Sequence, residues 1–176
     1  MQDANSATDF GALVSRIKSP ALLALASHWR DVRANRRMPG WSDLVPSALA
    51  PHLHKLWAFK YDRQSGEFAA RLAGTSVMLA SGRSFRGTPL KEIHPPHIFK
   101  RAHANLTRIV TEPAAYRCAG PLFRIGDKLV EGERVVLPLA ANGELADGVV
   151  AASDFKMPKV TGAIEILADK VEWFFV

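Results

Sequence analysis

The stretch from residue 114 to residue 155 constrains the fold most, because it has the pattern of three consecutive β-strands. We expect these strands over Ala114–Ile125, Lys128–Leu139 and Ala146–Phe155, with turns at IGDK and ANGE between them. Asn142-Gly143, in the second turn, is a strong signal for a β-hairpin. The second half of the chain therefore predicts an antiparallel meander.

A further hairpin is expected in the first half of the chain. The segment HLHKLWAFKYD, residues 52–62, alternates along its length like a strand, and RQSG forms a tight turn. The strand expected over 67–73 then returns beside the first. Short helical pieces follow, and after them one long helix begins at Pro95-Pro96 and ends at Pro113. Its apolar stripe contains Ile98, Ala102, Leu106, Ile109 and Val110.

This order of elements, with strands at both ends and helices between them, predicts an α+β fold. We expect a five-stranded antiparallel sheet with helices on one face. A separate N-terminal helix should begin at Ser19-Pro20, because serine caps a helix and proline is tolerated in its first turn. Leu22, Leu25 and Trp29 recur in it at helical spacing.

Composition bounds the class of protein. The 176 residues suit one domain, and a net charge of +6 permits acidic partners without requiring them. The single cysteine, Cys118, excludes an internal disulfide and fits a reducing compartment. The N-terminus lacks the pattern of a secretory signal, and the run ALLALA is far shorter than the roughly 20 residues of a membrane span. We expect a cytoplasmic protein with no membrane span.

Three segments carry a resemblance to a known family. They are RMPGWSDLVPSALAPHL, RLAGTSVMLASGRSFRGTPLKEI and VVLPLAANG. With their RMPG, RLAGT and GRxxxG motifs in this order, they resemble a single-PAS family common in alphaproteobacteria. The resemblance covers residues 28–155. It implies a PAS-like fold, and a bacterial sensory or interaction module in signal transduction rather than an enzyme.

On this basis the chain divides into four parts. We expect a flexible N-terminus over 1–18, a flanking helix and linker over 19–49, a PAS-like domain over 50–157 and a C-terminal extension over 158–176. Two functions remain open. One is a stand-alone sensor that binds a small molecule in its core and signals to a protein partner. The other is an adaptor or regulator for protein–protein interaction, with a filled core and no ligand.

A ligand cavity would lie between the inner face of the sheet and the long helix. Strand parity does not say which face of the first strand points inward, and we favour the face of Trp57 and Phe59. The apolar candidates that would join them are Leu72, Val77, Phe85, Ile93, Leu106, Leu137, Leu139 and Val149. The polar candidates are Thr75, Tyr116 and Arg117, of which Arg117 could hold a carboxylate or face water. Apolar residues at regular spacing can equally form a filled core.

Cofactors receive little support from the sequence. The six histidines lack a helical i, i+4 pair and a nearby cysteine or acidic cluster, so we expect no metal site. A haem would need a helix histidine such as His103 or His97. Flavin photoreceptors of the LOV type use a cysteine in a short Asn-Cys-Arg motif on a helix. Cys118 instead lies on an expected strand, and the motif is absent around it. We therefore expect neither haem nor flavin, and the ligand is unknown.

Other activities are not indicated. Motifs of phosphate loops, serine hydrolases and zinc proteases are missing from the sequence, so we expect no enzyme. The arginines of WRDVRANRR suit a solvated helix end better than a nucleic-acid site. The apolar stripe of Leu22, Leu25 and Trp29, and the terminal WFFV, must be buried somewhere. We expect a homodimer formed through one of these two surfaces.

Overall fold

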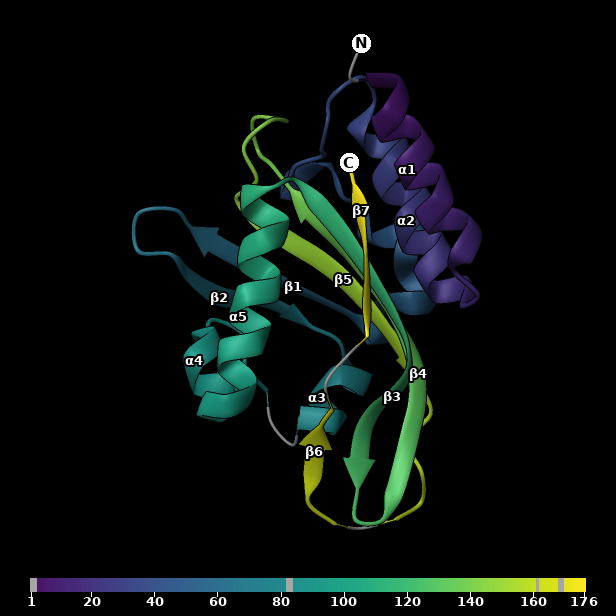
Figure 1. The fold of residues 1–176 in the computed structure, drawn as a ribbon, viewed down its shortest axis with the longest axis vertical. Coiled ribbons are helices and arrows are strands. Elements are labelled where there is room, and N and C mark those ends of the chain that lie inside the picture. Colours follow the sequence, from purple (N-terminus) through teal and green to yellow (C-terminus); the bar gives the residue numbers. More distant parts are fainter. Residues whose placement is uncertain (1–2, 82–83, 161, 168–169) are drawn as a thin grey trace.

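The computed structural model describes residues 3–81, 84–160, 162–167 and 170–176. Its centre is one antiparallel sheet with helices on both faces (Figure 1). Five of its strands have the order β2-β1-β5-β4-β3. The described strands are β1 Leu56–Asp62, β2 Glu67–Ala73, β3 Ala114–Ile125, β4 Lys128–Leu139, β5 Gly148–Phe155, β6 Ile164–Ile166 and β7 Val171–Phe175.

The predicted α+β fold is confirmed, and the sheet is larger than expected. β6 and β7 both pair with β3, along different parts of its outer edge. Both strands lie in the segment 158–176, which we expected to be an extension outside the sheet. Among the described residues, no helix is long and apolar enough to cross a membrane.

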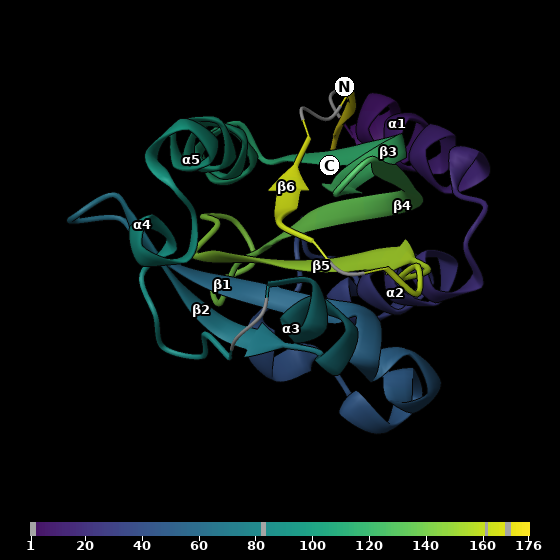
Figure 2. The same cartoon turned by 90° about the horizontal axis from the view of Figure 1, so that it is seen from below.

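The helices form two groups, which Figures 1 and 2 show on either side of the sheet. α5 packs on β3, β4 and β5, and the short α3 and α4 lie at the same end of the structure as the start of α5. α1 and α2, which we call the helical pair, pack on β7 and on β4 and β5. The bounds are α1 Asp3–Arg16, α2 Pro20–Arg33, α3 Thr75–Ser81, α4 Leu90–Ile93 and α5 Pro96–Thr111.

α2 begins where the sequence predicts. Ser19 is its N-cap and accepts a hydrogen bond from the Leu22 backbone N–H. Leu22, Leu25 and Trp29 are fully buried within the chain. The Trp29 indole donates a 2.7 Å hydrogen bond to the Pro138 carbonyl, which fixes α2 against β4. The proposed dimer surface of Leu22, Leu25 and Trp29 is therefore wrong, because the sheet of the same chain covers it.

The N-terminal segment also differs from the expectation of flexibility over 1–18, because α1 occupies residues 3–16. Phe10, Leu13 and Ile17 are buried, and the Phe10 ring stacks on Trp29 with the ring centroids 5.0 Å apart. The C-terminal tail packs beside this helix. Phe174 and Val176 are buried in the chain itself, so most of the terminal apolar cluster is already covered.

The segment before β1 is a 3-10 helix, η2, over Pro46–Lys55, preceded by η1 over Trp41–Asp43. We expected the strand to begin at residue 52, and it begins at Leu56. Pro51 lies inside η2, and proline lacks the N–H that a central strand must donate. The strand therefore starts only after this segment.

The motifs that carried the resemblance make contacts within the fold. In RMPG, the Met38 backbone N–H donates to the Gly143 carbonyl, and Pro39 accepts from the Ala140 N–H at 2.9 Å. The end of RLAGT packs against η2, because a Cβ atom at Gly74 would lie under 3.0 Å from backbone atoms of His54. In GRSFRG, the first two residues lie outside the described part of the chain.

Candidate functional site

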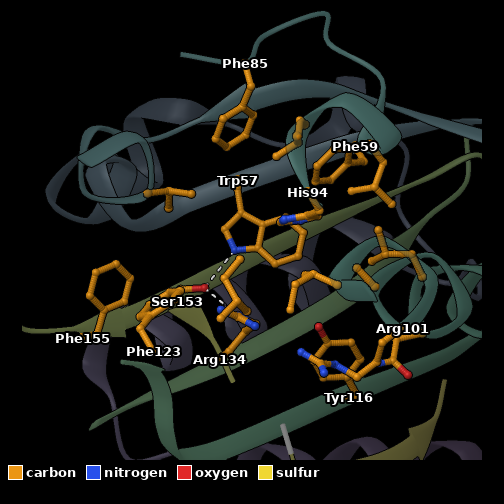
Figure 3. Close-up of a pocket in the computed structure, with 18 residues that line it drawn as sticks. Trp57, Phe59, Phe85, His94, Arg101, Tyr116, Phe123, Arg134, Ser153 and Phe155 are labelled. Atoms are coloured by element: carbon orange, nitrogen blue, oxygen red, sulfur yellow. Dashed lines mark hydrogen bonds between the residues drawn. The ribbon is translucent and has the colours of Figure 1, made fainter. Parts of the chain in front are cut away.

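A cavity of about 120 Å³ lies between the sheet and α5, and we call it the core cavity (Figure 3). β1, β3, β4, β5 and β6 supply one part of its lining, and α3, α4 and α5 with their loops supply the other. Seven residues that we proposed from the sequence line it. They are Trp57, Phe59, Val77, Phe85, Ile93, Leu106 and Tyr116.

The walls of the core cavity are mostly apolar and aromatic. The rings of Trp57 and Phe59 meet edge to face, with their centroids 5.8 Å apart. Phe123 and Phe155 form a second edge-to-face pair at 4.9 Å. Such pairs add to the stability gained from burial and keep the rings in defined orientations. The apolar part of the cavity is therefore shaped largely by these aromatic pairs.

A buried serine connects two strands and the largest ring at the cavity wall. Ser153 on β5 is 2% exposed. Its Oγ accepts a 2.9 Å hydrogen bond from Trp57 Nε1 and another, also of 2.9 Å, from Arg134 Nε. Figure 3 shows Trp57 and Arg134 reaching this hydroxyl from different sides. The serine thus fixes the indole and the guanidinium group at the edge of the cavity.

The remaining polar lining consists of hydrogen-bond donors and groups that can donate. Arg101 and Asn105 project from α5, and His94 precedes it. Arg101 donates a 2.8 Å hydrogen bond to the Leu167 carbonyl, which connects α5 to the segment just after β6. None of the described residues that line the cavity is an aspartate or a glutamate. The described lining therefore contains two arginines, Arg101 and Arg134, and no carboxylate.

Six of the proposed residues do not line the core cavity. They are Leu72, Thr75, Arg117, Leu137, Leu139 and Val149. Leu137 and Leu139 alternate with the cavity-facing Arg134 along β4, and so lie on the opposite face of the sheet. A bulge in the β1–β2 pairing sets Leu72 opposite Ala58 rather than beside Phe59. Val149 shares the face of Phe59 but lies outside the lining.

Arg117 is the clearest of these differences. It is buried on β3, next to the cavity-lining Tyr116, and its side chain lies on the other face of the sheet. Its Nε donates to Glu133 at 2.6 Å, and a terminal nitrogen donates to Glu172 on β7 at 2.9 Å. The idea that Arg117 holds a ligand carboxylate is therefore wrong, because two carboxylates of the protein already bind it.

Sequence reasoning missed the residues that supply the charge of the cavity. Arg101 and Asn105 flank the apolar stripe of α5. They would have been found if the polar neighbours of the stripe had been included among the candidates. Arg134 and Ser153 face each other across β4 and β5 in the strand register. The other missed residues of the lining are Leu90, His94, Ile98, Ala102, Phe123, Phe155 and Ile166.

The described residues include no group of three or more histidines, cysteines, aspartates and glutamates that could hold a metal ion. His103, one of two candidates for a haem ligand, does not line the core cavity. Its Nε2 lies 2.9 Å from the Gly66 carbonyl, and its ring packs against Phe68 and Phe99. His97 is exposed. His94 is the one histidine in the described lining.

The opposite face of the sheet carries a group of hydrogen bonds that holds the helical pair. Glu133 accepts from the backbone N–H groups of Lys18 and Ser19. Asp154 accepts from the Ser19 hydroxyl at 2.5 Å and from Lys55 Nζ at 2.6 Å. Burial acts to raise the pKa of Asp154, but the hydrogen bonds from Lys55 and Ser19 outweigh it and keep the pKa below its usual value. Asp154 is therefore held as a carboxylate.

Comparison with known families gives a match over most of the chain. The family model described as "PAS domain" matches residues 17–150, which is more than half of the chain. The match covers α2 to the first residues of β5, and leaves Ser153, Phe155 and Ile166 of the cavity lining beyond its end. No curated protein matches the sequence.

Proposed function

The chain belongs to the PAS domain family, and from this premise we propose that it senses a small molecule bound in the core cavity and signals to a protein partner. PAS domains are in general sensory and signalling modules. In this proposal the chain acts by binding and not by catalysis. We place it in the cytoplasm, a reducing compartment that suits the buried thiol of Cys118, the single cysteine of the chain.

The observation that carries the proposal is the composition of the cavity wall. Ligand sites are mostly apolar and contain a few polar groups that orient the ligand. The core cavity has aromatic walls and one organised polar group, in which Ser153 holds Trp57 and Arg134 in place. A core that served only for stability would gain little from placing the half-buried Arg101 and Arg134 beside a cavity, because it is costly to remove charge from water.

The volume limits the size of the ligand. Sites for drug-sized ligands usually measure roughly 300–1,000 Å³, and the core cavity measures about 120 Å³. The ligand must therefore be small unless the walls move. The same small volume favours the second candidate function, a ligand-free adaptor for protein–protein interaction.

Signalling needs a connection from the cavity to a surface. Ser153 and Arg134 line the cavity, while their chain neighbours Asp154 and Glu133 bind the start of α2 on the other side of the sheet. A shift of β4 and β5 on ligand binding would therefore change the contacts of the helical pair. We infer that the partner responds to the position of these helices.

The test compares two substitutions on α5. Ala102 lines the core cavity, and Ala104 is exposed on the same helix. Ala102→Phe should fill the cavity, and Ala104→Phe is the matched control. Native mass spectrometry of protein purified from its host should detect a small molecule on the wild type and on Ala104→Phe, and none on Ala102→Phe.

The proposal of a sensor would be contradicted by two results together. The wild type would carry no small molecule, and the Ala102→Phe variant would still bind the same protein partner as the wild type. That result would support the adaptor instead. Thermal unfolding of both variants shows that each one is folded before the comparison is made.

A further inference from the structure

We propose that the core cavity binds an uncharged molecule smaller than benzene, made of a short aliphatic group and one polar group, and that Asn105 forms the hydrogen bond to that polar group. This inference rests on the proposed function, and it names the class of ligand. Small alcohols, ketones and amides belong to this class. Asn105 would select them over apolar molecules of the same shape.

The first argument is the position of Asn105 and its lack of a partner. Asn105 follows Ile98 by two helical turns and Ala102 by one turn, and all three residues line the core cavity. The side chain of Asn105 is half-buried and forms no hydrogen bond with a described residue. An amide has an oxygen that accepts and an NH2 group that donates, and leaving them unpaired beside apolar groups costs free energy. A ligand with one polar group would pair with them.

The second argument is that the other polar side chains of the described lining are already engaged within the chain. Ser153 accepts hydrogen bonds from Trp57 and from Arg134. His94 and Tyr116 also have interactions inside the protein. Asn105 is therefore the polar side chain of the described lining that has a hydrogen bond left to offer.

The third argument is that the two arginines do not require an anion. Arg134 donates to Ser153 at 2.9 Å and has a further interaction within the chain, and Arg101 donates to the Leu167 carbonyl at 2.8 Å. Both arginines are half-buried, so water still reaches part of each side chain. An anion that entered the cavity would lose its own hydration among mostly apolar walls. An uncharged ligand avoids this cost.

The fourth argument is size. The core cavity measures about 120 Å³, and an engineered apolar cavity of about 150 Å³ takes up benzene. In proportion, the core cavity would hold roughly four non-hydrogen atoms. Phe59, Val77 and Ile98 provide apolar walls for the carbon atoms of the ligand. Figure 3 shows the aromatic rings, among them Trp57 and Phe59, that surround this space.

Titrations with propan-2-ol and 2-chloropropane test this inference, because the two compounds have the same branched shape and only the first has a hydroxyl group. Binding is followed by NMR through the indole N–H signal of Trp57, which lies at the cavity wall. Asn105→Leu should weaken the binding of propan-2-ol about threefold to tenfold, the effect of one hydrogen bond. It should not weaken the binding of 2-chloropropane. The ratio of the two dissociation constants thus separates a lost hydrogen bond from a general change in the structure.

Asn35→Leu is the matched control, because Asn35 is an exposed asparagine in the turn after α2 and lies outside the cavity. It should leave the ratio of the dissociation constants unchanged. Thermal unfolding of each variant shows whether the protein is folded. Ala102→Phe should abolish the binding of both compounds, and propan-2-ol that still bound to this variant would lie outside the cavity and overturn the inference.

Propionate serves as a charged probe of similar size and should bind more weakly than propan-2-ol. If propionate binds the wild type more tightly, the ligand is an anion and the uncharged class is wrong. If Asn105→Leu keeps the full affinity for propan-2-ol, the role of Asn105 is wrong. If none of the three compounds binds, the inference is also overturned, whereas the proposed function is decided by the small molecule found on the purified protein.

Discussion

Glu133 and Arg134 are consecutive residues of β4 whose side chains lie on opposite faces of the sheet. Arg134 lines the core cavity and donates to Ser153. Glu133 is buried on the other face, where it binds Arg117 and the backbone that leads into α2. A single strand thus connects the proposed ligand site with the helical pair.

Glu133→Gln should destabilise the protein. Gln retains an acceptor but removes one of the two charges that balance the buried Arg117, so the loss should approach the roughly 3 kcal/mol that breaking a buried pair costs. Urea unfolding at neutral pH measures this loss. Glu165→Gln is the control, because Glu165 pairs with Arg124 at an exposed position and its loss should cost less than about 1 kcal/mol. Equal effects of the two substitutions would contradict the importance of the buried pair.

Asp154 should make stability depend on pH. Its pKa is lower in the folded protein than the usual value of 3.8, so folding gains stability when the carboxylate is charged. This contribution is present above the usual pKa and is lost as the pH falls through the lower pKa of the folded state. Asp154→Asn should therefore cost about 1 kcal/mol at pH 7 and progressively less below about pH 4.

Unfolding free energies of the wild type and Asp154→Asn, measured between pH 7 and pH 2, check the expected dependence. Asp127→Asn, at an exposed position in the turn between β3 and β4, is the control. A cost for Asp154→Asn that stays constant down to pH 2 would show that the charge of Asp154 does not contribute.

Gly74→Ala should destabilise the protein by more than about 2 kcal/mol, because the new Cβ would overlap the backbone of His54 and Leu53. Gly11 provides a control of opposite sign. It lies inside α1, and a Cβ added there would meet no neighbouring atom within 4 Å, so Gly11→Ala should stabilise the helix by roughly 0.5–1 kcal/mol. Thermal melts of the two variants should shift in opposite directions. If Gly74→Ala left the melting temperature unchanged, η2 would have to be able to move away from the end of β2.

Leu25→Ala should reduce stability and leave the oligomeric state unchanged. Leu25 is fully buried under the sheet of its own chain, and a large-to-small change of this kind costs about 2–5 kcal/mol. Light scattering with size-exclusion chromatography should give the same mass for the variant and the wild type. If Leu25→Ala were as stable as the wild type but had half its mass in solution, Leu25 would lie in a dimer interface, which the structure contradicts.

Local patterns predicted the central strands well, because alternation and turn residues act over short distances. β3 and β4 have the expected bounds, and β5 begins two residues later than expected. β6 and β7 were missed, because three- and five-residue segments become strands only through pairing with the distant edge of β3. α1 was missed because its few apolar residues are stabilised by packing on β7 and α2, as in the stacking of Phe10 on Trp29.

The cavity was harder to predict than the fold. Helices cover both faces of the sheet, so both faces of β3 and β4 are largely buried, and the alternation of polar and apolar residues that would identify the inner face is weak. Arg117 and Arg134 are both arginines on central strands, and only the register of β3 with β4 shows which of them meets the cavity. Position along a strand does not distinguish them.

The covering of the sheet by the helical pair has a consequence for the rate of partner binding. A partner that needed the face beneath α2 could bind only those molecules in which the buried Trp29 had first moved away from Pro138. The observed association rate would then stop rising as the partner concentration increased, and its plateau would equal the rate at which the helices open. A partner that bound the outer surface of the same helices would show a rate that keeps increasing linearly.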